Sequence, residues 1–108
     1  MAYNEELAVR LRQHLASFGE GITEKKMFGG LCFLYQGKMS VGIVKDDLCV
    51  RLVSERESGE LAKPYVRPMD FTKKPMKEFI YVSSEGYQSE PDLAHWVNLG
   101  IEHAESKL

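Results

Sequence analysis

The segment from residue 25 to residue 53, KKMFGGLCFLYQGKMSVGIVKDDLCVRLV, constrains the fold more than any other part of this sequence. It is rich in β-branched and aromatic residues, which favour β-strands. Two short polar pairs, Gln36-Gly37 and Asp46-Asp47, interrupt it and have the length that closes a β-hairpin. Gly37 can also adopt the positive φ that such a turn requires. The segment therefore predicts three consecutive antiparallel strands joined by two tight turns.

Antiparallel pairing across these turns predicts which side chains share a face of the sheet. Leu34 is expected opposite Met39, and Cys32 opposite Val41. In this register Cys32 and Cys49 point to opposite faces. The expected core face carries Phe28, Cys32, Leu34, Met39, Val41, Ile43, Leu48, Val50 and Leu52.

The second face of the predicted sheet is mixed rather than polar. It carries apolar residues such as Leu31 and Phe33 beside Cys49 and Arg51. Two explanations are open: another part of the chain covers this face, or a partner does, which includes a second copy of the chain. Because few helical segments are available to cover it, we interpret the face as a homodimer or partner interface.

A glycine-lined patch is the clearest candidate binding surface on that second face. Gly29 and Gly42 lie on the same side as Arg51 in the predicted register. Adjacent glycines in a strand indicate a bulge, a bend or a close backbone approach, and a guanidinium beside them can receive a carboxylate or phosphate. We therefore predict a partner or ligand patch made of Gly29, Gly42, Arg51, Leu31 and Phe33. The alternative is a sheet that bends where a helix or second subunit crosses it.

Three helices are predicted around these strands. The first follows Asn4, a good N-cap, and presents a stripe of leucines. The second, residues 55–63, begins with Ser54 in a capping-box spacing. The last begins at Ser89 and contains Gly100, which indicates a close approach of this helix to the sheet.

Two further strands complete the predicted fold. Residues 65–71 include Pro68, which restricts them to an edge of the sheet, whereas residues 78–83 have a dense strand pattern. The element order α-β-β-β-α-β-β-α predicts an α+β fold with two layers and a mainly antiparallel, five-stranded sheet. We expect residues 1–108 to form a single domain.

The composition is that of an ordinary globular protein, with 108 residues, 44% hydrophobic and 28% charged, and a net charge of -2. This slightly acidic balance argues against a protein whose main role is to bind nucleic acid. The sequence lacks the pattern of a signal peptide or a membrane span. Its cysteines then indicate the reducing environment of the cytoplasm.

No residue pattern predicts a catalytic, cofactor or metal site. His95 and His103 are too far apart on the last helix to act as metal ligands one turn apart, and Cys49 has no predicted histidine base. A basic loop, residues 63–77, is the remaining candidate for binding. Its possible phosphate contacts are Arg67, Lys73, Lys74 and Lys77. The alternative is a solvated loop.

A series of short motifs occurs in the order found in one known family: Lys26-Met27-Phe28-Gly29-Gly30, Gly37-Lys38-Met39, Leu48-Cys49-Val50-Arg51, Met76, Phe79-Ile80-Tyr81-Val82, and Pro91, Trp96 and Ala104. With these motifs the chain resembles the N-terminal domain of the TfoX (Sxy) competence regulators, and the MFGG motif is the most specific of them. The resemblance implies a secretion-chaperone-like topology, a role in regulating bacterial competence, and no catalytic residues. Full-length members carry a second, helical domain, so this chain resembles a stand-alone version.

Together these features predict a non-enzymatic, cytoplasmic module that binds another protein in a regulatory or transcriptional setting. We expect it to form a homodimer and to need no cofactor, metal or membrane. Two alternatives remain open. One is direct contact with nucleic acid through the loop of residues 63–77, and the other is binding of a small anionic ligand near Arg51.

Overall fold

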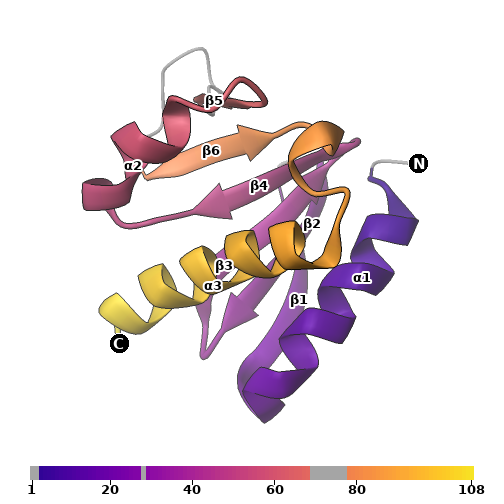
Figure 1. Ribbon diagram of the computed structural model, residues 1–108. Coiled ribbons are helices and arrows are strands. Elements are labelled where there is room, and N and C mark those ends of the chain that lie inside the picture. Colours follow the sequence, from indigo (N-terminus) through magenta and orange to yellow (C-terminus); the bar gives the residue numbers. More distant parts are fainter. Residues whose placement is uncertain (1–2, 28, 69–77) are drawn as a thin grey trace.

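The fold is built on an antiparallel sheet whose strand order is β1-β2-β3-β4-β6-β5 (Figure 1). The computed structural model describes residues 3–27, 29–68 and 78–108, and six strands lie within these ranges. Their bounds are β1 Ile22–Met27, β2 Gly30–Tyr35, β3 Lys38–Val44, β4 Asp47–Arg51, β5 Val66–Pro68 and β6 Phe79–Val82.

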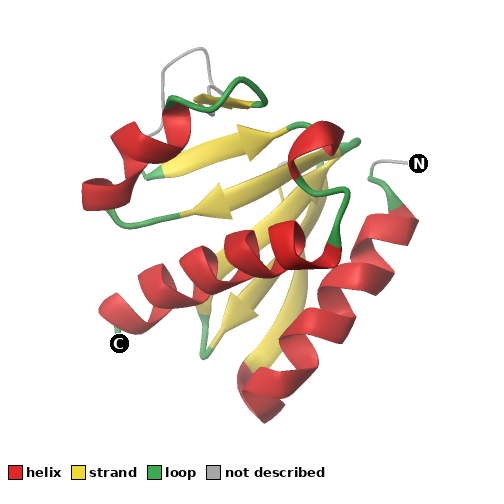
Figure 2. Ribbon diagram, in the orientation of Figure 1, coloured by secondary structure: helices red, strands yellow, loops and turns green. Residues whose placement is uncertain are grey.

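Three α-helices, α1 (Glu5–Leu15), α2 (Ser54–Leu61) and α3 (Glu90–Ser106), lie on the same face of this sheet (Figure 2). Short 3-10 helices at residues Ala16–Gly21 and Ser84–Gly86 precede β1 and α3. The guanidinium of Arg56 in α2 binds the carboxylate of Glu102 in α3, with an N–O distance of 2.6 Å. None of the helices in the described ranges is long and apolar enough to cross a membrane.

Two of the three predicted helix starts are confirmed. The Asn4 side chain accepts a hydrogen bond from the backbone N–H of Leu7, and the Ser89 hydroxyl accepts one from the backbone N–H of Asp92. The predicted cap at Ser54 is wrong. Ser54 is already the first helical residue, and the preceding residue, Val53, makes no side-chain cap.

The α+β class and the mainly antiparallel sheet are confirmed, but the predicted count of five strands is wrong. The additional strand is β1, whose residues 23–26 are polar and exposed and therefore lack a strand pattern. Lys25 to Met27 belong to this strand and not to β2. The chain reverses before β2, where Gly29 has a φ of 74°. The likeness to secretion chaperones stays a prediction.

Gly30 explains why the turn between β1 and β2 needs a second glycine. A Cβ atom at this position would lie 1.8 Å from the carbonyl oxygen of Ile43 in the neighbouring strand β3. No side chain fits in that space without moving the backbone. The MFGG motif thus combines a residue with positive φ and a residue at a close backbone contact.

A β-bulge at Ser40 changes which side of β2 faces the helices. Leu34 pairs with Met39 as predicted, but Phe33 then pairs with Val41, which leaves Ser40 as the extra residue. Its hydroxyl donates a hydrogen bond of 2.9 Å to the carbonyl of Phe33. A one-residue shift exchanges the two faces of a strand. The predicted pairing of Cys32 with Val41 is therefore wrong.

The core lies between the sheet and the helices α1 and α3, and α2 adds the partly buried Leu61 beside it. It contains Leu7, Leu11 and Leu15 of α1, Leu31, Phe33, Val41, Ile43, Leu48 and Val50 of the sheet, Leu52 directly after β4, and Leu93, Trp96 and Val97 of α3. The indole N–H of Trp96 donates to the carbonyl of Gly86 at 2.8 Å. A Cβ at Gly100 would lie 2.5 Å from the carbonyl oxygen of Ser40, which confirms the predicted close approach of α3 to the sheet.

Both edges of the sheet carry features that discourage pairing with another strand. The strand β1 presents Glu24, Lys25 and Lys26, and β5 is short and ends in Pro68. Edge charges and proline are common protections against strand addition. A partner is therefore expected to bind a face of this protein and not to extend its sheet.

Candidate functional site

The face of the sheet opposite the three helices is the candidate site, and we call it the helix-free face. It carries the apolar cluster Cys32, Met39, Cys49, Phe79 and Tyr81, with Val44 packed beside it, and the arginines Arg51 and Arg67. Lys25 shares this face because it pairs with Cys32. No α-helix from the described part of the chain lies over it.

The two arginines of the helix-free face are fixed by stacking on aromatic rings. The guanidinium carbon of Arg51 lies 5.0 Å from the ring centre of Phe79, and that of Arg67 lies 5.0 Å from the ring centre of Tyr81. Cation–π contacts of this kind restrict the long arginine side chain. Both cations are therefore held in place on the sheet.

The two arginines differ in their acidic partners. Arg67 donates to the carboxylate of Asp47 at 2.5 Å and to the hydroxyl of Ser83 at 3.3 Å. Arg51 has no hydrogen-bond acceptor among the described residues, and its Nε is buried without a partner. A buried donor without an acceptor is unfavourable. Arg51 is thus a positioned cation whose Nε–H lacks an acceptor in the described part of the chain.

The apolar side chains of this face are already buried, whereas the sequence was interpreted as giving this face an apolar surface for a second copy or a partner. Cys32 is 3% exposed and Cys49 is 1% exposed. The large hydrophobic side chains that remain exposed in the described ranges are Val9 and Leu108, which are not part of the cluster. The helix-free face therefore offers fixed charge more than apolar area.

Cys32 and Cys49 lie on the same face, so the prediction of opposite faces is wrong. The bulge at Ser40 is the cause, because it turns Cys32 towards the side of Gly42 and Cys49. The two cysteines flank β3, and strands separated by one strand are about 9–10 Å apart. A disulfide needs Cα atoms within about 7 Å. Both thiols are accordingly free.

Burial makes these thiols poor nucleophiles. It raises the pKa of Cys32 to about 11, and it raises the pKa of Cys49 further. Only the thiolate form attacks or binds metals. Neither cysteine is suited to catalysis near neutral pH.

The predicted patch is only partly brought together. Gly42 and Arg51 lie in β3 and β4 of the helix-free face, and Gly29 lies in the exposed turn after β1. Leu31 and Phe33 were placed on this face wrongly. They are buried in the core beneath the helices, at 4% and 0% exposure, because the bulge reverses β2.

The basic loop is less available for phosphate than its sequence indicates. Arg67 is paired with Asp47, and the ammonium of Lys63 lies 2.8 Å from the carboxylate of Glu60. Lys63 also lies over the ring of Trp96, at 5.0 Å from its centre. The other predicted contacts, Lys73, Lys74 and Lys77, lie outside the described residues.

Sequence reasoning missed a pair formed by the buried His103 and the partly exposed Glu78. The Nε2 of His103 lies 3.1 Å from the Glu78 carboxylate, and the His103 side chain is fully buried. Its Nδ1 has no partner among the described residues. Glu78 has a φ of 67°, and the hydrogen bond from His103 lowers its carboxyl pKa. No local motif announces this pair, because it depends on α3 crossing the start of β6.

Acid is expected to destabilise the protein through such carboxylates. Hydrogen bonds lower the carboxyl pKa of Glu78 (from His103), Glu24 (from Arg12) and Glu102 (from Arg56) below the ordinary value of 4.5. A lowered folded-state pKa adds stability above about pH 4.5, and this is lost as pH falls through the folded value. Urea unfolding at a series of pH values should show the free energy of unfolding decreasing below that point. An unchanged value down to about pH 3 would contradict the prediction.

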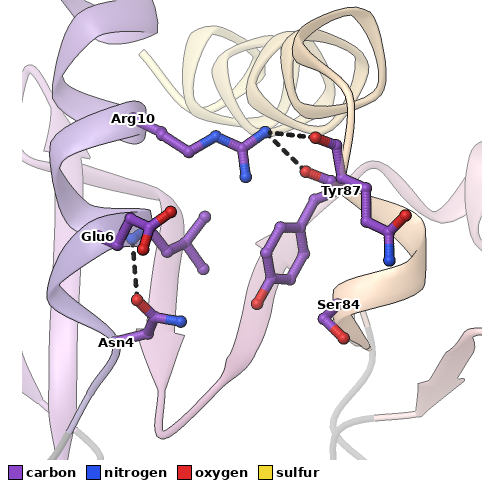
Figure 3. A pocket seen from close by; sticks show the side chains of 7 residues that line it. Asn4, Glu6, Arg10, Ser84 and Tyr87 are labelled. Atoms are coloured by element: carbon purple, nitrogen blue, oxygen red, sulfur yellow. Dashed lines mark hydrogen bonds between the residues drawn. The ribbon is translucent and has the colours of Figure 1, made fainter.

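A polar hollow of about 240 Å³ lies between α1 and the loop before α3 (Figure 3). Arg10 crosses this region and donates to the carbonyl oxygens of Tyr87 and Gln88, at 2.7 and 3.2 Å. Its Nε also donates to the Glu90 carboxylate at 2.9 Å. The Tyr87 hydroxyl donates to the carbonyl of Asp46 at 2.5 Å. These satisfied contacts make the hollow a structural junction between α1, α3 and the sheet.

A second groove of about 280 Å³ lies between α2 and α3. Its lining includes Arg56 and Glu102, which neutralise each other, and His95, which is paired with Glu60 at 3.1 Å. In the described parts of the chain, no three or more His, Cys, Asp or Glu side chains group in a way that could hold a metal ion. Ser84 and Glu6 both line the first hollow, but no hydrogen bond joins the Ser84 hydroxyl to a base among the described residues.

These observations define a class of protein: an α+β module whose antiparallel sheet carries helices on one face and aromatic-stacked arginines on the other. The chain belongs to the TfoX N-terminal domain family, whose model matches residues 13–104. This is a regulatory domain family of the competence type. No match was found among curated proteins.

Proposed function

We propose that this chain is a non-catalytic regulatory module that acts by binding another protein through the helix-free face. The observation that carries the proposal is the pair of fixed arginines on a face that no described helix covers. Charged and aromatic groups held in place in advance reduce the entropic cost of binding. The protected sheet edges leave this face as the surface that a regulatory partner would use.

The described histidines support a role without catalysis. His14, His95 and His103 each contact a glutamate, and those glutamates come from other elements of the fold. None of the three imidazoles has a Ser or Cys side chain as its hydrogen-bond partner among the described residues, and the hydroxyls of Ser17 and Ser106 donate to the backbone carbonyls of His14 and His103. A catalytic base needs a nucleophile or substrate proton within hydrogen-bond reach. Their contacts instead join helices to one another and to the sheet.

Site-specific photo-crosslinking in the native cell tests the proposed face. A benzophenone amino acid at Lys25 would sit on the helix-free face, and the same group at Asn98 would sit on the exposed side of α3. We expect position 25 to give a discrete crosslinked band containing another protein, and position 98 to give none. The same partner from both positions, or no band from position 25, would contradict the proposal.

Self-association remains a separate prediction, because the apolar surface on which it was based is buried. A homodimer through the helix-free face would compete with any other partner for the same residues. Light scattering over a hundredfold dilution measures the mass directly. Stable protein interfaces typically bury about 1,600 Å² of surface. A dimer held by charge alone, without a large buried interface, is expected to dissociate on dilution. A monomer at every concentration would contradict the homodimer.

A further inference from the structure

Arg51 differs from the other arginines of the chain. Arg10, Arg12, Arg56 and Arg67 each contact a carboxylate, namely that of Glu90, Glu24, Glu102 and Asp47 respectively. Arg51 makes no ion pair or hydrogen bond with a carboxylate in the described ranges, although its charge is near enough to Glu78 to help lower the pKa of that carboxyl, and its Nε is buried without an acceptor. The fold therefore supplies a direct ion pair for four of these cations and leaves Arg51 without one within the part of the chain that the structure describes.

The guanidinium of Arg51 is nevertheless held in a defined position. It stacks on Phe79 at 5.0 Å, and Phe79 is itself buried in the apolar cluster of the helix-free face. The planar edge of a guanidinium matches a carboxylate, with which it forms two parallel hydrogen bonds. A stacked arginine presents this edge at little further entropic cost.

We propose that Arg51 is the anchor for a carboxylate in an acidic segment of the partner protein. This inference rests on the proposed function and specifies the chemistry of the partner. Charge favours this occupant: the helix-free face carries Lys25 and Arg51, whereas α3 on the opposite side carries four acidic residues and no lysine or arginine of its own, with Glu90 and Glu102 neutralised by Arg10 and Arg56 of other helices. An acidic segment is therefore attracted more strongly to the first side than to the second.

Arg67 provides a matched control within the same sheet. It stacks on Tyr81 at the distance at which Arg51 stacks on Phe79, and both rings belong to β6. Arg67 is already neutralised by Asp47. Replacing either arginine with glutamine removes one positive charge from the same face, but only Arg51→Gln removes an unpaired guanidinium.

The proposal can be tested by NMR with a hexaglutamate peptide as the probe. The Nε–H signal of Arg51 is identified as the one that Arg51→Gln removes, and the burial of this nitrogen slows its exchange with water. We expect hexaglutamate to shift that signal. Arg51→Gln should weaken peptide binding by about tenfold, and Arg67→Gln by less than about twofold.

Three other outcomes would each overturn the inference. Equal losses in both variants would indicate a general positive potential. Tighter, Arg51-dependent binding of a thymidine decanucleotide would indicate nucleic acid, and an equal shift by acetate at the same carboxylate concentration would indicate a free small anion. Crosslinking from position 25 in the Arg51→Gln protein distinguishes the proposal that the helix-free face binds a protein from the proposal that Arg51 anchors a carboxylate of that protein. If that band persists unchanged, the face binds a protein but not through this carboxylate.

Discussion

Replacing Gly30 with alanine is expected to lower the free energy of unfolding by about 3 kcal/mol or more, at the upper end of the range for overpacked positions. The new Cβ would lie 1.8 Å from the carbonyl oxygen of Ile43, and this neighbour is backbone, which cannot rotate away. Strands β2 and β3 would have to separate where β2 begins. Urea denaturation monitored by the fluorescence of Trp96, which is buried against the same sheet, measures the change.

Alanine substitutions at two other glycines provide controls for the effect at Gly30. Gly59 lies in α2, and no atom lies within 4 Å of the position that a Cβ would occupy there, so Gly59→Ala should raise stability by about 0.5–1 kcal/mol. Gly29 also has open space but a φ of 74°, so Gly29→Ala should cost about 1 kcal/mol through backbone strain alone. A Gly30→Ala protein as stable as Gly29→Ala would show that the contact with Ile43 is not as close as described.

The second large effect concerns thiol reactivity. At about pH 8, Cys32 and Cys49 should react with a disulfide reagent at least about a hundredfold more slowly in the folded protein than in concentrated urea. The pKa of Cys32 is raised by burial from the ordinary 9.0 to about 11, which alone reduces its thiolate fraction by about two orders of magnitude. Cys49 is the more deeply buried of the two and should be slower.

Reaction progress followed by absorbance gives both rates in one experiment. The Cys32→Ala and Cys49→Ala variants assign each phase to its residue, and the urea-unfolded protein supplies the reference rate. Rapid modification of either thiol in the folded protein would show that the helix-free face opens to solvent. The apolar cluster of this face would then be accessible to a partner, as the interpretation of the second face as an interface assumed.

Local signals in the sequence predicted most parts of the fold that depend on neighbouring residues. The turn at Gln36-Gly37 is one, because both residues adopt positive φ there, as a tight hairpin turn requires. The caps at Asn4 and Ser89 are others. The close approach at Gly100 was also predictable, since a helical glycine in an apolar stripe usually has a packing reason. The second hairpin turn, however, was placed one residue too late, at Asp46-Asp47, whereas Val44 pairs with Asp47 and the turn is Lys45-Asp46.

The features that were missed depend on contacts between distant segments. Nothing beside Ser40 marks it as a bulge, yet this one residue exchanges Leu31 and Phe33 with Cys32 on the two faces. The strand β1 was missed because an exposed, charged edge strand needs no apolar alternation. Arg51 was identified as a candidate, but its lack of a direct ion pair among the described residues appears only when the other arginines have been placed. The Glu78–His103 pair likewise forms only in the folded chain.

The contacts of Arg10 bear on how this protein is completed during synthesis. Its side chain joins α1 to carbonyl groups located 77 and 78 positions later in the chain. A growing polypeptide can pair β1 to β4 and place the first helix beside them early, through Arg12–Glu24 and the hydrogen bond from Asn4 N–H to the Lys45 carbonyl, but the contacts of Arg10 form only after residues 87–90 have left the ribosome. These contacts are therefore among the last to form, and a nascent chain stalled before Tyr87 should leave the first helix more sensitive to protease than the complete chain.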